Sequence, residues 1–240
     1  GNYGSVWSDY DNDGDLDLYL SKCKGGVTDS TDPRRVNLLY RNDAGVYNEV
    51  ANSANVDDGS QSWCADFGDI DNDGDFDLIV VNHYAFHRLY ENNGDGTFTR
   101  ITTQAGIDEY TNAGVWQSIF TDLDNDGWLD LIMATEDNGK IIYQNDGDGT
   151  FTLVNNPLDS NKLYSVSIGD LNNDGFTDMY SIRKNQPPNV YDDEIHFNNG
   201  NSNNYLGVTV LDNDFPAAIG TKIKLYGNWG VQTRELRAGE

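Results

Sequence analysis

The stretch Asp9-Tyr10-Asp11-Asn12-Asp13-Gly14-Asp15-Leu16-Asp17 decides how this chain folds, because it is the first of four copies. The others are DIDNDGDFD at 69–77, DLDNDGWLD at 122–130 and DLNNDGFTD at 170–178. Side-chain oxygens stand at positions 1, 3, 5 and 9, and glycine stands at position 6. Calcium takes about six to eight oxygen ligands, and glycine permits the sharp turn of a loop that supplies them. The spacing therefore predicts up to four calcium sites.

The predicted ligands of each loop are the side chains at positions 1, 3, 5 and 9 and the backbone carbonyl at position 7. The complete set is Asp9, Asp11, Asp13, Asp15, Asp17, Asp69, Asp71, Asp73, Asp75, Asp77, Asp122, Asp124, Asp126, Trp128, Asp130, Asp170, Asn172, Asp174, Phe176 and Asp178. Acidic surface turns without metal are the alternative. Four copies of one ligand spacing favour calcium.

The loops are not EF-hands. An EF-hand needs a bidentate Glu at position 12, where this chain has other residues: Leu20, Val80, Met133 and Ser181. EF-hand loops also join helices, whereas these loops run into alternating segments such as 16–20 and 76–80, which are typical of strands. We therefore expect each loop to join two strands of a β-hairpin.

The loops begin 60, 53 and 48 residues apart, a spacing close to the length of one blade of a β-propeller. An aromatic residue stands six residues before each loop, and a large apolar residue stands two before: Tyr3 and Trp7, Trp63 and Phe67, Trp116 and Phe120, Tyr164 and Ile168. Residues four apart share one face of a strand, so each pair is predicted to point into a core between sheets. A sugar-binding platform of aromatic rings is the alternative.

Each repeat continues through a second and a third strand, the latter carrying Leu39–Asn42, Leu89–Asn92, Ile142–Asn145 or His196–Asn198. Gly-rich turns follow, most clearly at 93–98 and 146–151, and their chemistry suits tight hairpins into a fourth strand. Four antiparallel strands per repeat predict an all-β fold of propeller blades over residues 1–203.

These loops, the Leu-Tyr-x-Asn strand and the Gly-Asp-Gly-Thr-Phe hairpin resemble FG-GAP/VCBS-type repeats, the calcium-binding blades of integrin-α-like propellers. The resemblance implies the same calcium ligands. Asn172 replaces Asp at position 3, so the fourth loop is expected to bind most weakly. Such propellers usually close with more blades than four. The four repeats are therefore expected either to close as a small propeller or to be part of a larger, or intermolecularly completed, one.

Residues 204–240 lack an acidic loop and contain three alternating segments, predicted as strands at 205–211, 221–226 and 231–236. The segments Asn204–Val208, Ala218–Gly220 and Gln232–Glu235 resemble part of an ASPIC/UnbV-type domain, which follows such propellers in secreted proteins.

The composition limits the partners. A net charge of −25 argues against nucleic acid and anionic membranes, and no apolar run is long enough for a membrane span. Fifteen of the 40 acidic residues lie at positions 1, 3, 5 and 9 of the loops, so calcium binding and folding should be coupled. Loops of this kind suit the calcium concentration outside cells, and we expect an extracellular, secreted or cell-surface protein.

Cys23 and Cys64 lie in neighbouring repeats, at the strand ends far from calcium. A disulfide between them is geometrically reasonable and would suit an oxidising compartment. Two unpaired thiols are the alternative.

The sequence predicts a non-enzymatic calcium-stabilised module for adhesion, matrix or surface and filament assembly. Its partner would be a protein or glycan, or a further copy at an open β edge. A lectin-like module that binds polysaccharide through Trp128 or Trp229 is the second hypothesis, and a polysaccharide-active enzyme the third. His83 and His87 have the spacing of a helical metal pair, but a strand and loop would not bring them together.

Overall fold

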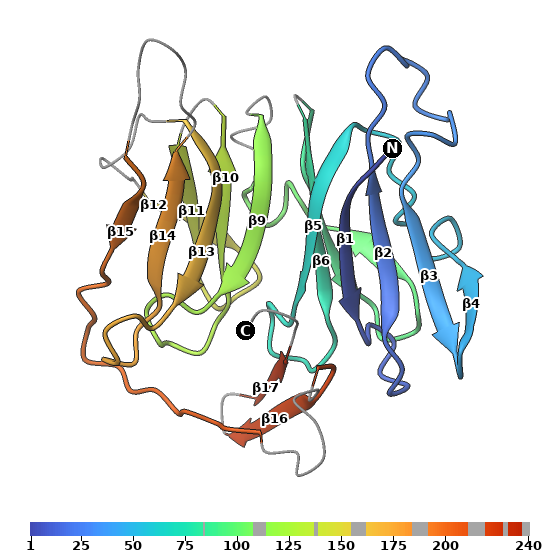
Figure 1. The fold of residues 1–240 in the computed structure, drawn as a ribbon. Helices are drawn as coiled ribbons and strands as arrows, with labels where there is room; N and C mark the ends of the chain where they lie inside the picture. The colour runs from blue at the N-terminus through green and yellow to red at the C-terminus, as the bar shows by residue number, and fades with distance from the viewer. Residues whose placement is uncertain are drawn as a thin grey trace.

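The computed structural model describes residues 1–83, 85–107, 114–136, 139–154, 162–183, 192–210, 219–227 and 230–236. Every regular element in these ranges is a β-strand, and all strand pairs are antiparallel. The fold is therefore all-β, as predicted. It consists of four propeller-type sheets followed by a β-hairpin (Figure 1).

Each of the first three sheets has four strands in chain order. The first sheet contains β1 (Asn2–Ser8), β2 (Asp17–Lys22), β3 (Leu38–Asp43) and β4 (Val46–Glu49). The second contains β5 (Ser62–Gly68), β6 (Asp77–Asn82), β7 (Arg88–Asn92) and β8 (Phe98–Arg100). The third contains β9 (Val115–Thr121), β10 (Asp130–Thr135), β11 (Gly139–Asn145) and β12 (Phe151–Val154).

The fourth sheet has three strands in the described chain: β13 (Leu163–Gly169), β14 (Asp178–Arg183) and β15 (Glu194–His196). The prediction of a fourth strand here is wrong, and the turn sequence gives a reason. Gly96 and Gly149 have φ of 83° and 85°, but Ser202 stands at their position. Asn204 likewise replaces Phe98 and Phe151, the aromatic residues that begin β8 and β12. The turn therefore lacks its glycine, and the strand lacks its buried ring.

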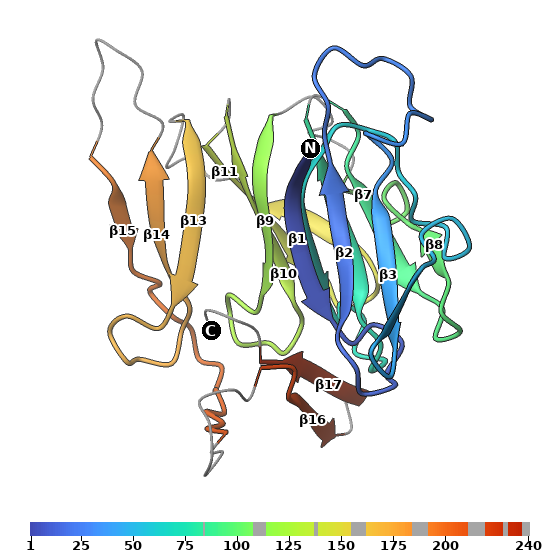
Figure 2. The same ribbon diagram turned by 45° about the vertical axis from the view of Figure 1, so that its right-hand side comes forward.

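The four sheets stand in a row, with β1, β5, β9 and β13 side by side and the first and fourth sheets at opposite ends (Figures 1 and 2). Three apolar clusters fill the spaces between successive sheets. Phe67 and Phe120 are buried there, as predicted, whereas Trp7 in the first sheet has no preceding sheet against it and is exposed. The core thus lies between blades, not within one.

The prediction that the aromatic residue six positions before each loop shares a strand face with the residue two positions before it is wrong. In each of the four strands the register shifts at this aromatic, which is the extra residue of a β-bulge. A bulge breaks the alternation of side chains and re-aims the extra one. The four rings, Tyr3, Trp63, Trp116 and Tyr164, form a ladder with successive centroids 6.1, 4.0 and 5.7 Å apart. Because the rings contact one another, packing explains this stripe better than a sugar platform.

The predicted disulfide is not formed, and both cysteines are free thiols. Trp63 is one reason, because its Nε1 donates to Cys23 Sγ at 3.2 Å. Cys64 packs instead against the cluster between the second and third sheets. Trp63 is the extra residue of the bulge between Ser62 and Cys64, so the bulge brings its ring, and not Cys64, to Cys23.

After the fourth sheet the chain passes beneath the sheets and ends in a hairpin of β16 (Lys222–Gly227) and β17 (Gly230–Glu235) (Figure 1). These strands confirm two of the three segments predicted after residue 204. The third prediction is wrong over 205–210, where the chain has no regular structure and is mostly exposed. Leu211, at the end of that segment, lies outside the described residues.

One asparagine near the end of each third strand ties the sheets together. We call Asn42, Asn92, Asn145 and Asn198 the bridging asparagines. In the second, third and fourth sheets, the amide Nδ2 donates to a carbonyl in the loop of the preceding sheet, with acceptors Tyr10, Ile70 and Leu123 at 2.7–2.8 Å. Each Nδ2 also donates to position 8 of its own loop. Buried amides thus join every blade to the one before it.

We expect Asn145→Ala to lower the free energy of unfolding by about 2–5 kcal/mol, because the carbonyls of Ile70 and Leu129 would lose a buried donor. Urea denaturation at fixed calcium concentration measures the change. Asn42→Ala is the matched control, since the Asn42 amide bonds the Leu16 carbonyl of its own loop and reaches no second sheet among the described residues. Equal losses in the two variants would contradict a role for the bond between sheets.

Candidate metal centre

All four acidic loops connect the first and second strands of a sheet, so they lie along the same edge of the four sheets, on the side of the C-terminal hairpin (Figure 1). The carboxylates shape each loop by accepting backbone N–H groups. Position 1 accepts from the glycine at position 6, position 3 from position 5, and position 5 from position 7, at 2.8–3.3 Å. The glycines themselves have φ between 87° and 101°, a region that glycine favours.

The loops bring carboxylates together as the sequence predicts. Three groups each offer one oxygen per residue within 4.8 Å of the others: Asp9, Asp11 and Asp13; Asp69, Asp71 and Asp73; Asp122, Asp124 and Asp130. Several of the predicted sites could therefore hold a metal ion. In the fourth loop, the Asn172 amide donates to Asp174 at 2.8 Å, so position 3 there presents a donor as well as an oxygen.

The aspartate at position 9 has a structural role that the sequence analysis missed. In these closing aspartates, Asp17, Asp77, Asp130 and Asp178, one oxygen accepts the N–H of position 2 and the other accepts the N–H of the bridging asparagine. The eight bonds measure 2.8–3.1 Å. The closing aspartate thus joins the start of the loop to the third strand, besides lying next to the other predicted ligands of the loop.

The asparagine at position 4 is a second residue that the ligand pattern does not explain. We call Asn12, Asn72, Asn125 and Asn173 the loop asparagines; all have φ between 58° and 61°. The first three donate Nδ2 to the glycine carbonyl at position 6 of the next loop, at 2.9–3.5 Å. Asn tolerates this left-handed conformation better than most residues. Its recurrence at position 4 is the sequence signal that could have revealed a link between loops.

The C-terminal hairpin brings cations to the first two loops. Lys222 Nζ lies 2.7 Å from Asp9 Oδ2 and also donates to the Asp9 carbonyl. Lys224 Nζ donates to the Gly74 carbonyl, and the Thr233 N–H donates to Asp69 Oδ2 at 3.0 Å. The hairpin therefore binds the loop end of the sheets through position 1 of two loops.

The donor set fits a hard cation. Asp9 is 5% exposed, and its Oδ1 is buried without a hydrogen-bond partner, although Oδ2 is paired. An unpaired buried carboxylate oxygen is costly, and a coordinated cation would satisfy it. Every predicted side-chain ligand offers oxygen, which suits calcium better than softer metals.

Burial and neighbouring charge disfavour ionised carboxylates in the metal-free loops. Burial is the main cause that raises the pKa of Asp71 to about 7, and repulsion from Asp73 adds to it. Burial likewise raises the pKa values of Asp17 and Asp130 to about 7, despite the N–H groups that they accept. A bound divalent cation would reverse this balance by favouring the charged forms.

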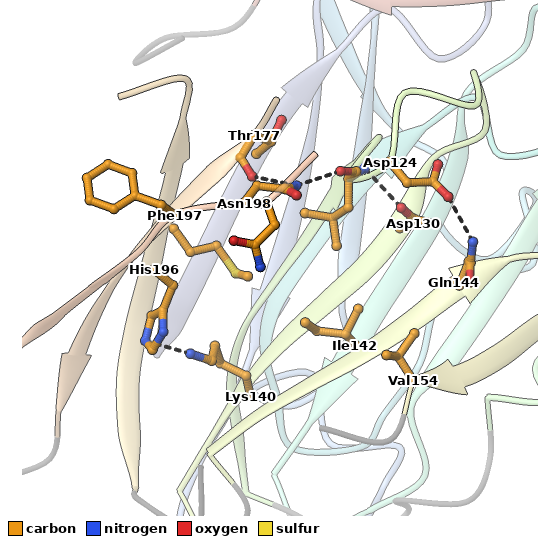
Figure 3. Close-up of a pocket in the computed structure, with 13 residues that line it drawn as sticks. Asp124, Asp130, Lys140, Ile142, Gln144, Val154, Thr177, His196, Phe197 and Asn198 are labelled. Atoms are coloured by element: carbon orange, nitrogen blue, oxygen red, sulfur yellow. Dashed lines mark hydrogen bonds between the residues drawn. The ribbon is translucent and has the colours of Figure 1, made fainter. Parts of the chain in front are cut away.

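An open pocket of about 360 Å³ lies at the junction of the third and fourth sheets, beside the third loop. Figure 3 shows Asn198 bonded to Thr177 and Leu123, and Gln144 bonded to Asp124. Leu123 lines this pocket, and it occupies the position of Tyr10, whose ring lies 5.6 Å from that of Phe98. The pocket therefore lies where the missing outer strand of the fourth sheet would place an aromatic ring.

The side chains of Trp128, His83 and His87 each contact a neighbouring residue of the chain. Trp128 is half-buried, and its indole packs against Gly147 of the neighbouring turn. His87 Nδ1 accepts the Asn82 N–H, whereas the His83 ring stacks on Trp63 with centroids 3.8 Å apart. Trp229 lies outside the described residues.

Comparison with known families agrees with these repeats. The FG-GAP-like repeat family matches residues 9–80, 77–133 and 122–181, which together cover most of the chain. The chain belongs to the FG-GAP-like repeat family. No curated protein matches the chain significantly. Among the described residues, no helix has the length and apolar character needed to cross a membrane.

The pKa shifts predict a pH dependence of the metal-free protein. Carboxyls whose pKa lies near 7 in the folded state, against about 3.8 for an exposed aspartate, bind protons more tightly in the folded state. Their protonation stabilises the fold at low pH, and this stability is lost as pH rises from about 4 through 7. With excess EGTA, we expect the melting temperature to be higher at pH 5 than at pH 8. A higher melting temperature at pH 8 would contradict the shifts.

A second prediction concerns the fourth loop. Asn172→Asp restores a carboxylate at position 3, and we expect it to tighten the weakest calcium step on the order of tenfold, equivalent to about 1.4 kcal/mol. Calorimetric titration against a competing chelator measures the step. Asn199→Asp adds the same charge to a nearby exposed position outside the loop and serves as the control. Equal tightening in both variants would show that general charge, not coordination, is responsible.

Proposed function

We propose that this protein is an extracellular calcium-binding β-propeller module that serves adhesion, matrix or surface and filament assembly, and that its calcium is structural. The observation that carries the proposal is the continuity of the loops with the joints between blades. The carboxylates that would bind calcium shape loops whose asparagines bond the next loop. An ion that rigidifies one loop would therefore also hold neighbouring blades in register.

The charge of the chain supports a location where calcium is abundant. At −25, the net charge would be reduced to −17 by four calcium ions. Loops of three or four carboxylates need a steady calcium supply to remain occupied and to offset their mutual repulsion. The extracellular space provides millimolar calcium, and adhesion or matrix proteins work there.

The partner that we propose is a protein or a glycan at the cell surface or in the matrix. The polysaccharide-binding alternative relied on exposed rings such as Trp128, but that ring packs against Gly147. Apolar side chains are instead exposed on the outermost sheets, with examples at Trp7, Ile195 and Phe197. Exposed apolar surface of this kind favours contact with another protein.

A thermal melt with millimolar calcium and with excess EGTA tests the proposal. At about 100-fold excess over Kd, each site adds about 2.7 kcal/mol, and about 1 kcal/mol raises the melting temperature of a domain of this size by about 2–4 °C. Two occupied sites therefore predict a rise of about 10 °C or more. An unchanged melting temperature would show that calcium does not stabilise the fold and would contradict the proposal.

A matched pair of variants locates the effect. Asp71→Asn removes one carboxylate from the second loop, and we expect it to reduce the calcium-induced rise. Asp95→Asn makes the same charge change in an exposed hairpin turn, where the carboxylate accepts from Thr97, and should leave the rise intact. Equal reductions would point to general charge screening. Magnesium at the same concentration should have a smaller effect, because it demands stricter octahedral geometry.

A further inference from the structure

The ammonium group of Lys222, on the first strand of the C-terminal hairpin, is bonded to the first acidic loop. Its Nζ lies 2.7 Å from Asp9 Oδ2, and it donates to the Asp9 carbonyl at 2.6 Å and to Asn12 Oδ1 at 2.7 Å. An ammonium has three N–H donors, so the first loop accepts all of them. The same Nζ lies 5.1 Å from the centroid of the Phe76 ring, which is a cation–π distance. Lys222 is therefore a tethered cation of the first loop.

The residue opposite Lys222 in the hairpin completes the contact with Asp9. Lys222 pairs with Glu235 across β16 and β17, and Glu235 Oε1 accepts the Asp9 N–H at 3.2 Å. One cross-strand pair thus contacts the carboxylate, the carbonyl and the N–H of the same residue. The side chains of Lys222 and Asp9 are only 14% and 7% exposed, so solvent and salt screen their charges weakly.

The second loop meets the hairpin without a charged contact at position 1. Two residues further along the hairpin, Lys224 pairs with Thr233, and the Thr233 N–H donates to Asp69 Oδ2 at 3.0 Å. Lys224 Nζ instead donates to the Gly74 carbonyl at position 6, at 3.3 Å. Among the described residues, an ion pair to position 1 is found in the first loop alone. The first loop is thus the one in which a lysine shares a predicted calcium ligand.

The two oxygens of the Asp9 carboxylate have different surroundings. Oδ2 accepts the Gly14 N–H at 3.1 Å besides contacting Lys222. Oδ1 is buried without a hydrogen-bond partner, so it is the oxygen left to coordinate a metal ion together with Asp11 and Asp13. A calcium ion on Oδ1 would share one carboxylate with the ammonium on Oδ2. Because like charges so close to each other repel, the two cations oppose each other.

We propose that Lys222 lowers the affinity of the first loop for calcium and is the counter-cation of this loop when calcium is absent. The proposal rests on the calcium-binding function above, and it names a residue outside the loop that sets the calcium concentration at which the loop fills. The composition of the hairpin agrees with this role. In a chain of net charge −25, β16 and β17 carry three cationic side chains, Lys222, Lys224 and Arg234, and one acidic side chain, Glu235.

The opposition between calcium and Lys222 is reciprocal. If the Lys222 contact reduces the affinity for calcium by a given factor, calcium weakens the Lys222 contact by the same factor. At low calcium the hairpin is then bound firmly to the first loop. At high calcium this contact weakens, while the bond from the Thr233 N–H to Asp69 in the second loop remains. The hairpin is thus a part of the fold whose attachment depends on calcium.

Calorimetric titration of calcium into the full chain, against a competing chelator, tests the proposal. Lys222→Met keeps an apolar stem and removes the charge. We expect it to tighten the calcium step of the first loop about tenfold, because a weakly screened positive charge is lost beside the ion. Lys222→Gln is the second variant if Lys222→Met folds poorly. Lys24→Met removes the same charge from an exposed site, beyond the end of β2 that lies away from the loop, and is the matched control.

A double-mutant cycle assigns the calcium step. Asp11→Asn weakens the first loop at position 3, and in this background Lys222→Met should no longer tighten any measured step. In EGTA, Lys222→Met should melt at a lower temperature than the unmodified protein, because the counter-cation is lost. Its calcium-induced rise should be larger by about 3–6 °C, as a tenfold tighter site predicts. A contact with a structural role alone would lower both melting temperatures equally and leave every calcium step unchanged.

Hydrogen exchange followed by mass spectrometry measures the attachment of the hairpin itself. In the unmodified protein, β16 and β17 should exchange faster in millimolar calcium than in EGTA, and this difference should be smaller in Lys222→Met. Inner strands such as β6 and β10 should exchange no faster in calcium, and they are the internal reference.

Four outcomes would overturn the proposal: unchanged or weaker calcium binding in both Lys222 variants, equal tightening in Lys24→Met, tightening that persists with Asp11→Asn, or slower exchange of the hairpin in calcium. The unmodified protein separates this proposal from the previous one. If it binds calcium and is stabilised by it while the Lys222 variants bind calcium no more tightly, the role of Lys222 alone is rejected. If calcium neither binds to the unmodified protein nor raises its melting temperature, the calcium-binding function itself is rejected.

Discussion

The rest of the structure depends on the pair formed by each closing aspartate and the bridging asparagine whose N–H it accepts. The aspartate joins the start of its loop to the third strand of its sheet through two backbone N–H groups, and the asparagine amide then reaches the loop of the preceding sheet. One buried carboxylate and one buried amide thus set both the shape of a blade and its distance from its neighbour. Full hydrogen bonding makes this buried polar pair tolerable, because unpaired polar atoms at the same place would be destabilising.

The same pair places the charged side chains of the loop at the point where two blades meet. The position of Asp77 is set by its bonds to Ile70 and Asn92, while burial raises its pKa well above the usual value. Hydrogen bonds alone therefore do not compensate for confining carboxylates there, and a positive charge is needed nearby. The hairpin brings such a charge to the first loop, where Lys222 contacts Asp9. Lys222 thus addresses at the first loop the same physical problem that a bound metal ion would address, namely clustered carboxylates at a buried joint.

Much of this arrangement could be predicted from the sequence, because the shape of each loop and strand depends on residues within the repeat itself. Glycine at position 6 and aspartates at alternate positions predicted the curled loops, and the alternating apolar residues predicted the strands. Contacts between repeats left weaker signals. The spacing of the metal ligands did not reveal that the Asn72 amide donates to the Gly127 carbonyl of the next loop. The alternation of apolar and polar residues did not reveal the bulge that changes the direction of the Trp63 side chain. The free cysteines fit the same bulge, since the extra residue Trp63 contacts Cys23 while Cys64 packs between the second and third sheets.

The distribution of the core has a consequence for how the chain can end. In a layered protein with one central core, terminal strands cover the edge of a common interior, but here each apolar cluster belongs to two neighbouring sheets. In an open row of sheets, the outer faces of the first and last sheets are therefore not covered by any junction within the row, however stable the inner junctions are. The third and fourth sheets show this directly: Ile132 is fully buried by its neighbour, and its counterpart Tyr180 is exposed. The fourth sheet thus carries, exposed, side chains whose counterparts in the earlier sheets are buried by the sheet that follows.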